Sequence, residues 1–226
     1  PEADHLDPDH YPALITVDLA AVRENVRALA DHAGGTPLLA VVKSNGYGLG
    51  RTEVAFAAYE EGVRWFAVSR IPEALALRES FDVAGIPPAD ARILTWIGAP
   101  DAGWAQAHRA HLDVSVSTVG QLVQAVRAAH TVAAEEGEMR PVRVHLNVDV
   151  GMSRGGATEV ELPELAALAK QAEDAGEVKV VGLLAHLPEA DDVSPAGLET
   201  TAAQTRRFAG YVESVHAAGL HPDVTH

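Results

Sequence analysis

The sequence predicts an α/β fold, in which parallel strands alternate with helices to form a sheet or a barrel. Short apolar runs and alanine-rich amphipathic stretches alternate from Thr36 onward, with a repeat of roughly 20–40 residues that is typical of βα units. The chain has 226 residues. A single domain of roughly 200–250 residues is ordinary for an α/β barrel, so one such domain accounts for the whole length.

The first predicted element is a helix over residues 19–30, because Asp18 is a favourable N-cap. Its apolar residues fall on one face at helical spacing: Leu19, Val22, Val26 and Leu29. Seven apolar runs after it predict strands, at 38–42, 65–68, 92–97, 112–116, 142–148, 179–184 and 223–226. Amphipathic stretches between them predict helices, for example at 119–134 and 162–175. A closed barrel of this type needs eight strands, so we expect an incomplete barrel whose seventh strand is cut short.

Composition excludes several classes of function. The formal net charge is −15, from 32 acidic and 17 basic residues, and such a charge repels nucleic acid and anionic membranes. The absence of cysteine rules out disulfides, thiolate catalysis and cysteine-metal sites, and fits a cytoplasmic protein. The histidines show no metal-binding spacing, so we expect no metal site. The acidic start is not a signal peptide and has no leading Met, so we expect a fragment of a longer chain.

Lys43 is the residue whose setting most favours chemistry. It follows the apolar run 38–42 in the segment LLAVVKSNGYGLG, and such a run predicts a strand buried on both faces. A lysine at the end of a barrel strand lies where barrels carry their active sites, and its amine can form a Schiff base with pyridoxal phosphate. The alternative is a strand-end lysine that extends its amine into water.

Four segments add a resemblance to a known family. They are ITVDLAAVRENVRAL (15–29), LLAVVKSNGYGLG (38–50), VRVHLNVDVGMSRGG (142–156) and VVGLLAHLPEADD (180–192). In this order they resemble the alanine racemase family: its opening, its cofactor-lysine segment AVVKANAYGHG, its VDTGMxRxG strand and loop, and its GxxTHFxxAD strand. The lysine segment matches at Lys43, Asn45, Tyr47, Gly48 and Gly50, and departs from the family at Ser44, Gly46 and Leu49.

The resemblance implies a TIM-type (β/α)8 barrel that binds pyridoxal 5'-phosphate and is followed in the family by a second, β-rich domain. Residues 1–18 would be an N-terminal extension, with a strand at 13–18 that pairs with this second domain. Residues 19–226 would be the cofactor-binding barrel, truncated in strand seven, and the second domain would be absent from the given chain.

The activity implied by the resemblance is racemisation of L-alanine and D-alanine by two bases, which supplies D-alanine for cell-wall peptidoglycan. One base is Lys43, and the other is a tyrosine from the partner subunit of a homodimer, outside this sequence. We therefore expect a cytoplasmic homodimer that acts on a small-molecule amino acid, and an inactive 1–226 fragment. Two alternatives stay open: a racemase of another amino acid such as serine, and a non-catalytic barrel that carries pyridoxal phosphate.

The resemblance also assigns contacts to the cofactor. Lys43 binds it covalently and moves the Cα proton on one face of the substrate. Tyr47 donates a hydrogen bond to the cofactor phosphate, and His186 stacks beside the pyridine ring. From its place at the end of the third strand, Trp96 is a candidate to face that ring, with a core tryptophan as the alternative. His226 is a candidate match to the histidine of the family's HxANS segment.

A second group of residues is expected at the substrate. By resemblance, Arg154 hydrogen-bonds the ring hydroxyl oxygen of the cofactor and helps to orient the substrate carboxylate, to which Met152 offers its backbone N–H. Many family members carry a carbamylated lysine at the position of Asn147, whose negative charge positions the arginine. Asn147 cannot be carbamylated, so a bound anion such as chloride is expected there, unless the arginine needs no such partner.

Overall fold

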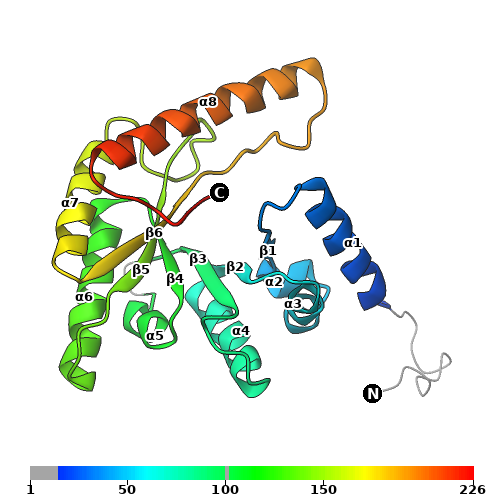
Figure 1. The fold of residues 1–226 in the computed structure, drawn as a ribbon, viewed down its shortest axis with the longest axis horizontal. Coiled ribbons are helices and arrows are strands. Elements are labelled where there is room, and N and C mark those ends of the chain that lie inside the picture. The colour runs from blue at the N-terminus through cyan, green and yellow to red at the C-terminus, as the bar shows by residue number, and fades with distance from the viewer. Residues whose placement is uncertain (1–14, 100–101) are drawn as a thin grey trace.

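The computed structural model describes residues 15–99 and 102–226. They form one parallel sheet in which each strand pairs with the next along the chain. The seven strands are β1 (Leu39–Val41), β2 (Trp65–Arg70), β3 (Arg92–Ile97), β4 (Asp113–Val116), β5 (Val142–Asn147), β6 (Val178–Leu184) and β7 (Val224–Thr225). The sheet is curled and has helices along its outer side, so the fold is an incomplete TIM-type barrel (Figure 1). The predicted fold class is thereby confirmed.

Eight helices lie in the described part of the chain. They are α1 (Leu19–His32), α2 (Lys43–Tyr47), α3 (Arg51–Glu60), α4 (Ile71–Val83), α5 (Trp104–Arg109), α6 (Val119–Glu136), α7 (Leu162–Asp174) and α8 (Pro195–Ala217). The predicted N-cap of α1 is confirmed, since the Asp18 carboxylate accepts hydrogen bonds from the N–H groups of Ala20 and Ala21. The apolar face predicted for α1 is only partly buried, because Leu29 is 59% exposed.

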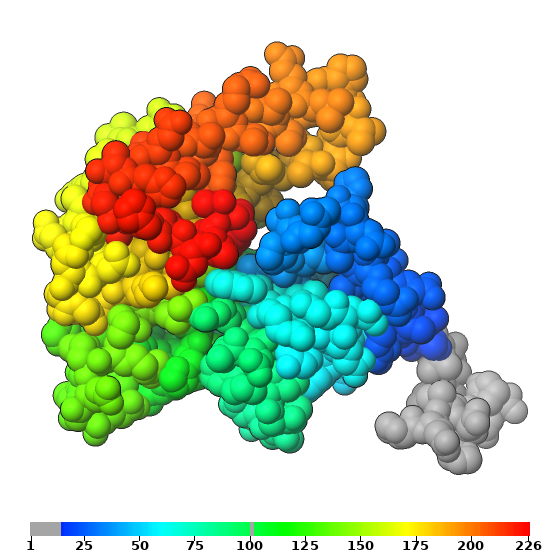
Figure 2. All heavy atoms as spheres, viewed as in Figure 1, coloured from blue at the N-terminus to red at the C-terminus, as the bar shows by residue number. Residues whose placement is uncertain are grey.

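The prediction that the first strand is buried on both faces is wrong. β1 is an edge strand with β2 as its partner in the described sheet, and Val41 is 37% exposed. On the surface of the molecule, a gap also lies between the start of α8 (orange) and the segment that leads from α1 into β1 (blue) (Figure 2). Residues 13 and 14 of the strand predicted at 13–18 lie outside the described residues, and residues 15–18 have no strand conformation. Its pairing with a second domain stays a prediction.

The main core lies between the sheet and the outer helices. It includes Phe66 and Leu146 from the strands and Phe81 and Leu165 from the helices, all of them at most 1% exposed. A smaller cluster, formed by Ala67, Leu94 and Leu184, packs on the inner face of the sheet. Within residues 15–99 and 102–226, every helix is too short or too polar to span a bilayer.

A chain of polar side chains also crosses the barrel interior. Asp113 on β4 accepts hydrogen bonds from Arg143 Nε at 2.6 Å and His145 Nε2 at 3.4 Å, and both Asp113 and His145 are fully buried. His145 Nδ1 lies 2.9 Å from His226 Nε2. Burial by itself would raise the pKa of Asp113, but the hydrogen bonds from His145 and Arg143 outweigh it and lower the pKa. A Cβ at Gly182 would lie 2.0 Å from His145 Nδ1, so only glycine leaves room for this ring.

We expect His108 to make the fold less stable in acid. This residue on α5 is 2% exposed, its Nε2 has no hydrogen-bond partner, and burial together with the Arg140 charge lowers its pKa to about 4. The unfolded chain binds a proton at this imidazole near pH 6.5, whereas the folded chain does so only near pH 4. Stability is therefore full above pH 6.5 and is lost as the pH falls through this window, by on the order of 2–3 kcal/mol.

Urea unfolding at pH 7, 5.5 and 4.5 measures this loss. The variant His108→Gln cannot titrate in this range, so the free energy of unfolding should vary less with pH than in the wild type. An equal pH dependence for both proteins would contradict the role given to His108.

Candidate active site

The residues predicted for the site line one cavity of about 790 Å³ at the carboxyl ends of the strands. Parallel barrels carry their ligands at this end of the sheet, and the volume is that of a small-molecule site. The predicted residues that line it are Lys43, Tyr47, Trp96, Asn147, Met152, Arg154, His186 and His226. The structure therefore brings all of them together, while their individual roles stay predictions.

Lys43 begins an unusual turn directly after β1. The next five residues, Ser44 to Gly48, all have positive φ, with values of 52°, 54°, 63°, 56° and 87°. Only glycine adopts this left-handed conformation without cost, so the three non-glycine residues Ser44, Asn45 and Tyr47 are held in it by their surroundings. The Asn45 side chain contributes, since its Oδ1 accepts a hydrogen bond of 3.1 Å from the Arg51 N–H. Strain of this kind is common where a backbone must present a functional side chain.

Glu73, at the start of α4, stabilises the left-handed segment that follows Lys43. Its carboxylate accepts hydrogen bonds from the N–H of Ser44 at 2.8 Å and from the N–H of Ser69 at 3.2 Å. Ser44 follows β1 and Ser69 lies at the end of β2, so one side chain ties the ends of two neighbouring strands together. The sequence analysis missed Glu73, because a glutamate in the first turn of a helix is usually explained by the helix dipole alone.

Two aromatic rings face the Lys43 amine. Its Nζ lies 5.8 Å from the centre of the Tyr47 ring and 5.7 Å from that of Trp96. At these distances a cation is attracted to the face of an aromatic ring. Tyr47 is 62% exposed and lines the cavity. Trp96 packs against the inner cluster of Ala67, Leu94 and Leu184, which fixes it as part of the cavity floor.

Met152 and Arg154 lie on a loop that leaves β5 on the other side of the cavity. The Asp149 carboxylate shapes this loop, since it accepts hydrogen bonds from the N–H of Gly151 at 2.9 Å and of Ser153 at 3.0 Å. Desolvation would raise the pKa of Asp149, but the backbone N–H groups of Ser153, Gly151 and Met152 lower it. Asp149 therefore stays ionised and holds the loop at neutral pH.

Charged side chains of both signs line the cavity: Lys43 and Arg154 are basic, and Asp149 and Glu161 are acidic. His186 follows β6, and its pKa is lowered first by burial and then by the charges of Arg154 and Lys43. Lys43, Arg154 and His186 line the same cavity, and the lowered pKa favours the neutral form of the His186 imidazole. Among these, Lys43 and Arg154 are the groups that could bind a phosphate or a carboxylate.

Asn147 at the end of β5 and His226 directly after β7 also line the cavity. The Asn147 amide donates a hydrogen bond of 3.0 Å to Ser117 Oγ, so it is anchored as a neutral group where the resemblance implies a charged one in many relatives. The His226 ring meets the buried His145, and burial and then His145 lower its pKa to about 4. His226 thereby connects the cavity to the polar chain inside the barrel.

Comparison with known proteins bears on what this cavity is for. The family described as "Alanine racemase, N-terminal domain" matches residues 17–226.

The chain belongs to the alanine racemase family.

Individual relatives agree with this membership. The alanine racemase of Beutenbergia cavernae is 44% identical over 216 residues, which are 96% of this chain and 53% of that protein. The solved alanine racemase of Streptomyces coelicolor superposes with a TM-score of 0.82 at 36% identity, over 93% of this chain and 52% of that one. A racemase structure from Bartonella henselae, with covalently bound pyridoxal phosphate, superposes with a TM-score of 0.65 at 25% identity, over 86% and 50%. The chain thus spans about half the length of the alanine racemases it matches.

One further cavity residue of this racemase-family barrel escaped the sequence analysis. Gln121 on α6 accepts a hydrogen bond of 2.7 Å from the Ser117 N–H and donates one of 3.0 Å to the Gly98 carbonyl. It thereby ties the chain after β4 to the chain after β3. A glutamine in an amphipathic helix gives no local signal of such a contact.

Among residues 15–99 and 102–226 no cluster of three or more His, Asp or Glu side chains could hold a metal ion.

Proposed function

We propose that this chain is the cofactor-binding barrel of an alanine racemase, which interconverts L-alanine and D-alanine. One observation carries the proposal: in a chain of the alanine racemase family, Lys43 and the loop with Met152 and Arg154 line the same cavity. An amine that moves a proton and a pair of groups that hold a carboxylate are what racemisation of an amino acid requires.

The residues of the cavity suit pyridoxal 5'-phosphate. Lys43 offers the primary amine to which its aldehyde would bind, and the Tyr47 phenol is a donor for its phosphate. Trp96 and the neutral His186 offer flat faces for a ring, and Arg154 offers a fork of donors for an oxygen of the cofactor. When bound, the cofactor withdraws electrons from the amino acid and thereby weakens its Cα–H bond.

The chain's own residues would then control one face of the reaction. The Lys43 amine removes the Cα proton on that face, or returns it. Tyr47 and Trp96 lie within 6 Å of this amine and restrict where it can move, with ring distances of 5.8 Å and 5.7 Å. Arg154 and the Met152 N–H would hold the substrate carboxylate and thereby orient the Cα hydrogen. The second base would be the partner subunit's tyrosine.

The test is a racemisation assay on the intact protein. L-alanine, D-alanine and L-serine are each incubated with the protein and pyridoxal phosphate, and the enantiomers are separated by chiral chromatography. Both alanine enantiomers should reach the same nearly equal mixture, and serine should react more slowly. Faster conversion of serine would favour a serine racemase, and no conversion of either amino acid with the cofactor bound would favour a carrier barrel.

Activity should also depend on chloride, because Asn147 is neutral at the position where the resemblance implies a negative charge in many relatives. A bound anion would offset the charge of Arg154, so replacing chloride by a large inert anion at fixed ionic strength should lower activity or cofactor affinity. The effect should exceed that of screening at an exposed pair, which is about 1 kcal/mol or less.

Asn147→Asp is the matched variant for this experiment. It supplies a carboxylate of nearly the same shape, so its activity should vary less with chloride than that of the wild type. Equal activity of the wild-type protein in both salts would leave Asn147 without an anion role.

We also propose that the intact enzyme is a cytoplasmic homodimer that supplies D-alanine for peptidoglycan. If the second base comes from the partner, residues 1–226 alone should be inactive. A monomeric intact protein with full activity in analytical ultracentrifugation and assay would contradict the shared site.

A further inference from the structure

The loop from Asp149 to Gly156 requires support beyond its own hydrogen bonds. It carries both Met152 and Arg154, and its conformation includes positive φ at Gly151, Ser153 and Gly156, of 123°, 57° and 111°. The Asp149 carboxylate holds the middle of the loop from inside, through Gly151 and Ser153. Its ends are fixed to the sheet, since Ala157 donates to the Asn147 carbonyl and Asp149 donates to the Ala157 carbonyl.

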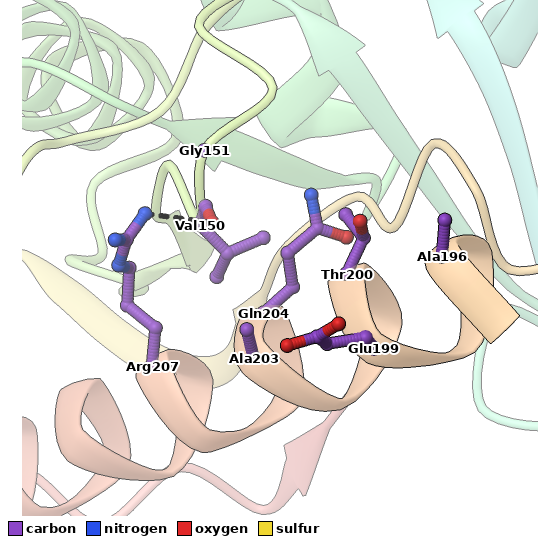
Figure 3. A pocket seen from close by; sticks show the side chains of 8 residues that line it. All are labelled: Val150, Gly151, Ala196, Glu199, Thr200, Ala203, Gln204 and Arg207. Carbon is purple, nitrogen blue, oxygen red and sulfur yellow. Dashed lines mark hydrogen bonds between the residues drawn. The ribbon is translucent and has the colours of Figure 1, made fainter.

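Helix α8 contacts the same loop through residues that do not line the cavity. Arg207 donates a hydrogen bond of 3.0 Å to the Val150 carbonyl (Figure 3), and its Nε lies 3.6 Å from a carboxylate oxygen of Glu159. One guanidinium thus spans the start of the loop and the chain just past its end. One turn further along α8, the Tyr211 hydroxyl donates a hydrogen bond of 3.0 Å to the Asp149 carbonyl.

The fit between helix and loop is close at Gly151. A Cβ at this position would lie 3.0 Å from Arg207 Nη1 and 4.0 Å from Gln204 Nε2. Gln204 is itself 7% exposed, and it lines the hollow of about 490 Å³ between α8 and the loop. Tyr211 is 4% exposed, and its buried hydroxyl has the Asp149 carbonyl as its hydrogen-bond partner. An exposed ion pair such as that of Arg207 with Glu159 adds little, so the two bonds to backbone carbonyls carry the contact.

We propose that Arg207 and Tyr211 are positioning residues for substrate binding: they hold the Asp149–Gly156 loop so that Met152 and Arg154 meet the substrate carboxylate. The inference rests on the proposed racemase function for the identity of that substrate, but not for the bracing itself. Neither side chain lines the cavity that holds Lys43, so their loss should leave the attachment of the cofactor intact. A displacement of the loop by about 1 Å is enough to weaken a reaction that depends on orientation by one to two orders of magnitude.

The experiment compares Arg207→Ala, Arg207→Lys and Tyr211→Phe with the wild type, all in the intact protein loaded with pyridoxal phosphate. For Arg207→Ala the KM for alanine should rise about tenfold while the cofactor absorbance is unchanged. Tyr211→Phe removes one hydroxyl and should raise the KM by about threefold. Arg207→Lys keeps a charged donor and should recover most of the loss.

Hydrogen exchange gives a second readout that does not require activity. In Arg207→Ala the amides of Gly151 and Ser153 should exchange about tenfold faster, while those of β5 and β6 stay as protected as in the wild type. Arg206→Ala is the matched control, because it removes the same side chain from an exposed neighbouring position on α8.

The outcomes separate the two proposals. If the wild type does not racemise alanine but the loop amides respond as expected, the proposed function fails and the bracing stands. If the wild type is active and both the KM and the loop exchange of Arg207→Ala and Tyr211→Phe match those of Arg206→Ala, the bracing is overturned. Faster exchange of strands and loop alike would also overturn it, since that result indicates only a general loss of stability.

Discussion

Replacement of Lys43 by alanine is expected to abolish racemisation and the covalent retention of pyridoxal phosphate. Lys43 is the lysine of the cavity, and its amine lies 5.7 Å from the Trp96 ring and 5.8 Å from that of Tyr47. In the proposed function its removal takes away both the covalent anchor and the base for one face, so the rate should fall by at least about a thousandfold.

The measurement combines an assay with chemical mapping. Borohydride reduction of the wild-type protein should fix the cofactor to the peptide that contains Lys43, and the variant should yield no reduced adduct. Lys179→Ala is the control, because Lys179 is exposed at the start of β6, away from the cavity. A reduced adduct on Lys170 or Lys179, or an active Lys43→Ala protein, would end this assignment.

Replacement of Gly156 by alanine is expected to disrupt the side of the cavity formed by the Asp149–Gly156 loop. The φ of Gly156 is +111°, and a Cβ there would lie 2.5 Å from the carbonyl carbon of Val148 and 2.6 Å from the Asp149 nitrogen. Both neighbours are backbone atoms that cannot rotate away, so the loop must move as a whole. Backbone strain alone is worth about 1–3 kcal/mol, and the clash adds to it, so the free energy of unfolding should fall by about 3 kcal/mol.

Gly155→Ala is the matched control for this substitution. The adjacent Gly155 has no atom within 4 Å of an added Cβ, so its replacement should change the free energy of unfolding by about 0.5 kcal/mol or less. For each variant, urea unfolding measures the free energy of unfolding, and the KM for alanine in the intact protein measures the effect on the cavity. Similar results for the two variants would show that the loop adapts to a side chain at Gly156.

The sequence predicted the strands well because each is a short apolar run between polar turns. All seven were found within two residues of their observed bounds, including 92–97, where the observed strand is Arg92–Ile97. The burial of β1 was predicted wrongly, because an apolar run does not reveal whether its strand has neighbours on both sides. The exposed Leu29 of α1 shows the same limit, since helical periodicity gives a face but not what covers it.

The site could be predicted where a residue directly follows a strand or belongs to a recognised segment. Lys43, Arg154 and His186 are of this kind, and they do share one cavity. Contacts that depend on packing between distant segments could not be predicted. Glu73 reaches Ser44 across 29 positions, and Arg207 reaches Val150 across 57. Neither residue carries a local signal that separates it from an ordinary helix surface residue.

The left-handed turn after Lys43 has a consequence for the order in which the molecule folds. Each non-glycine residue in this conformation costs roughly 1–2 kcal/mol, so three of them make the turn rare in the unfolded chain. The bond from the Ser44 N–H to Glu73 can form only once α4 has docked beside β2. We therefore expect the lysine to acquire its geometry late, after the first two βα units have assembled and α4 has packed beside β2.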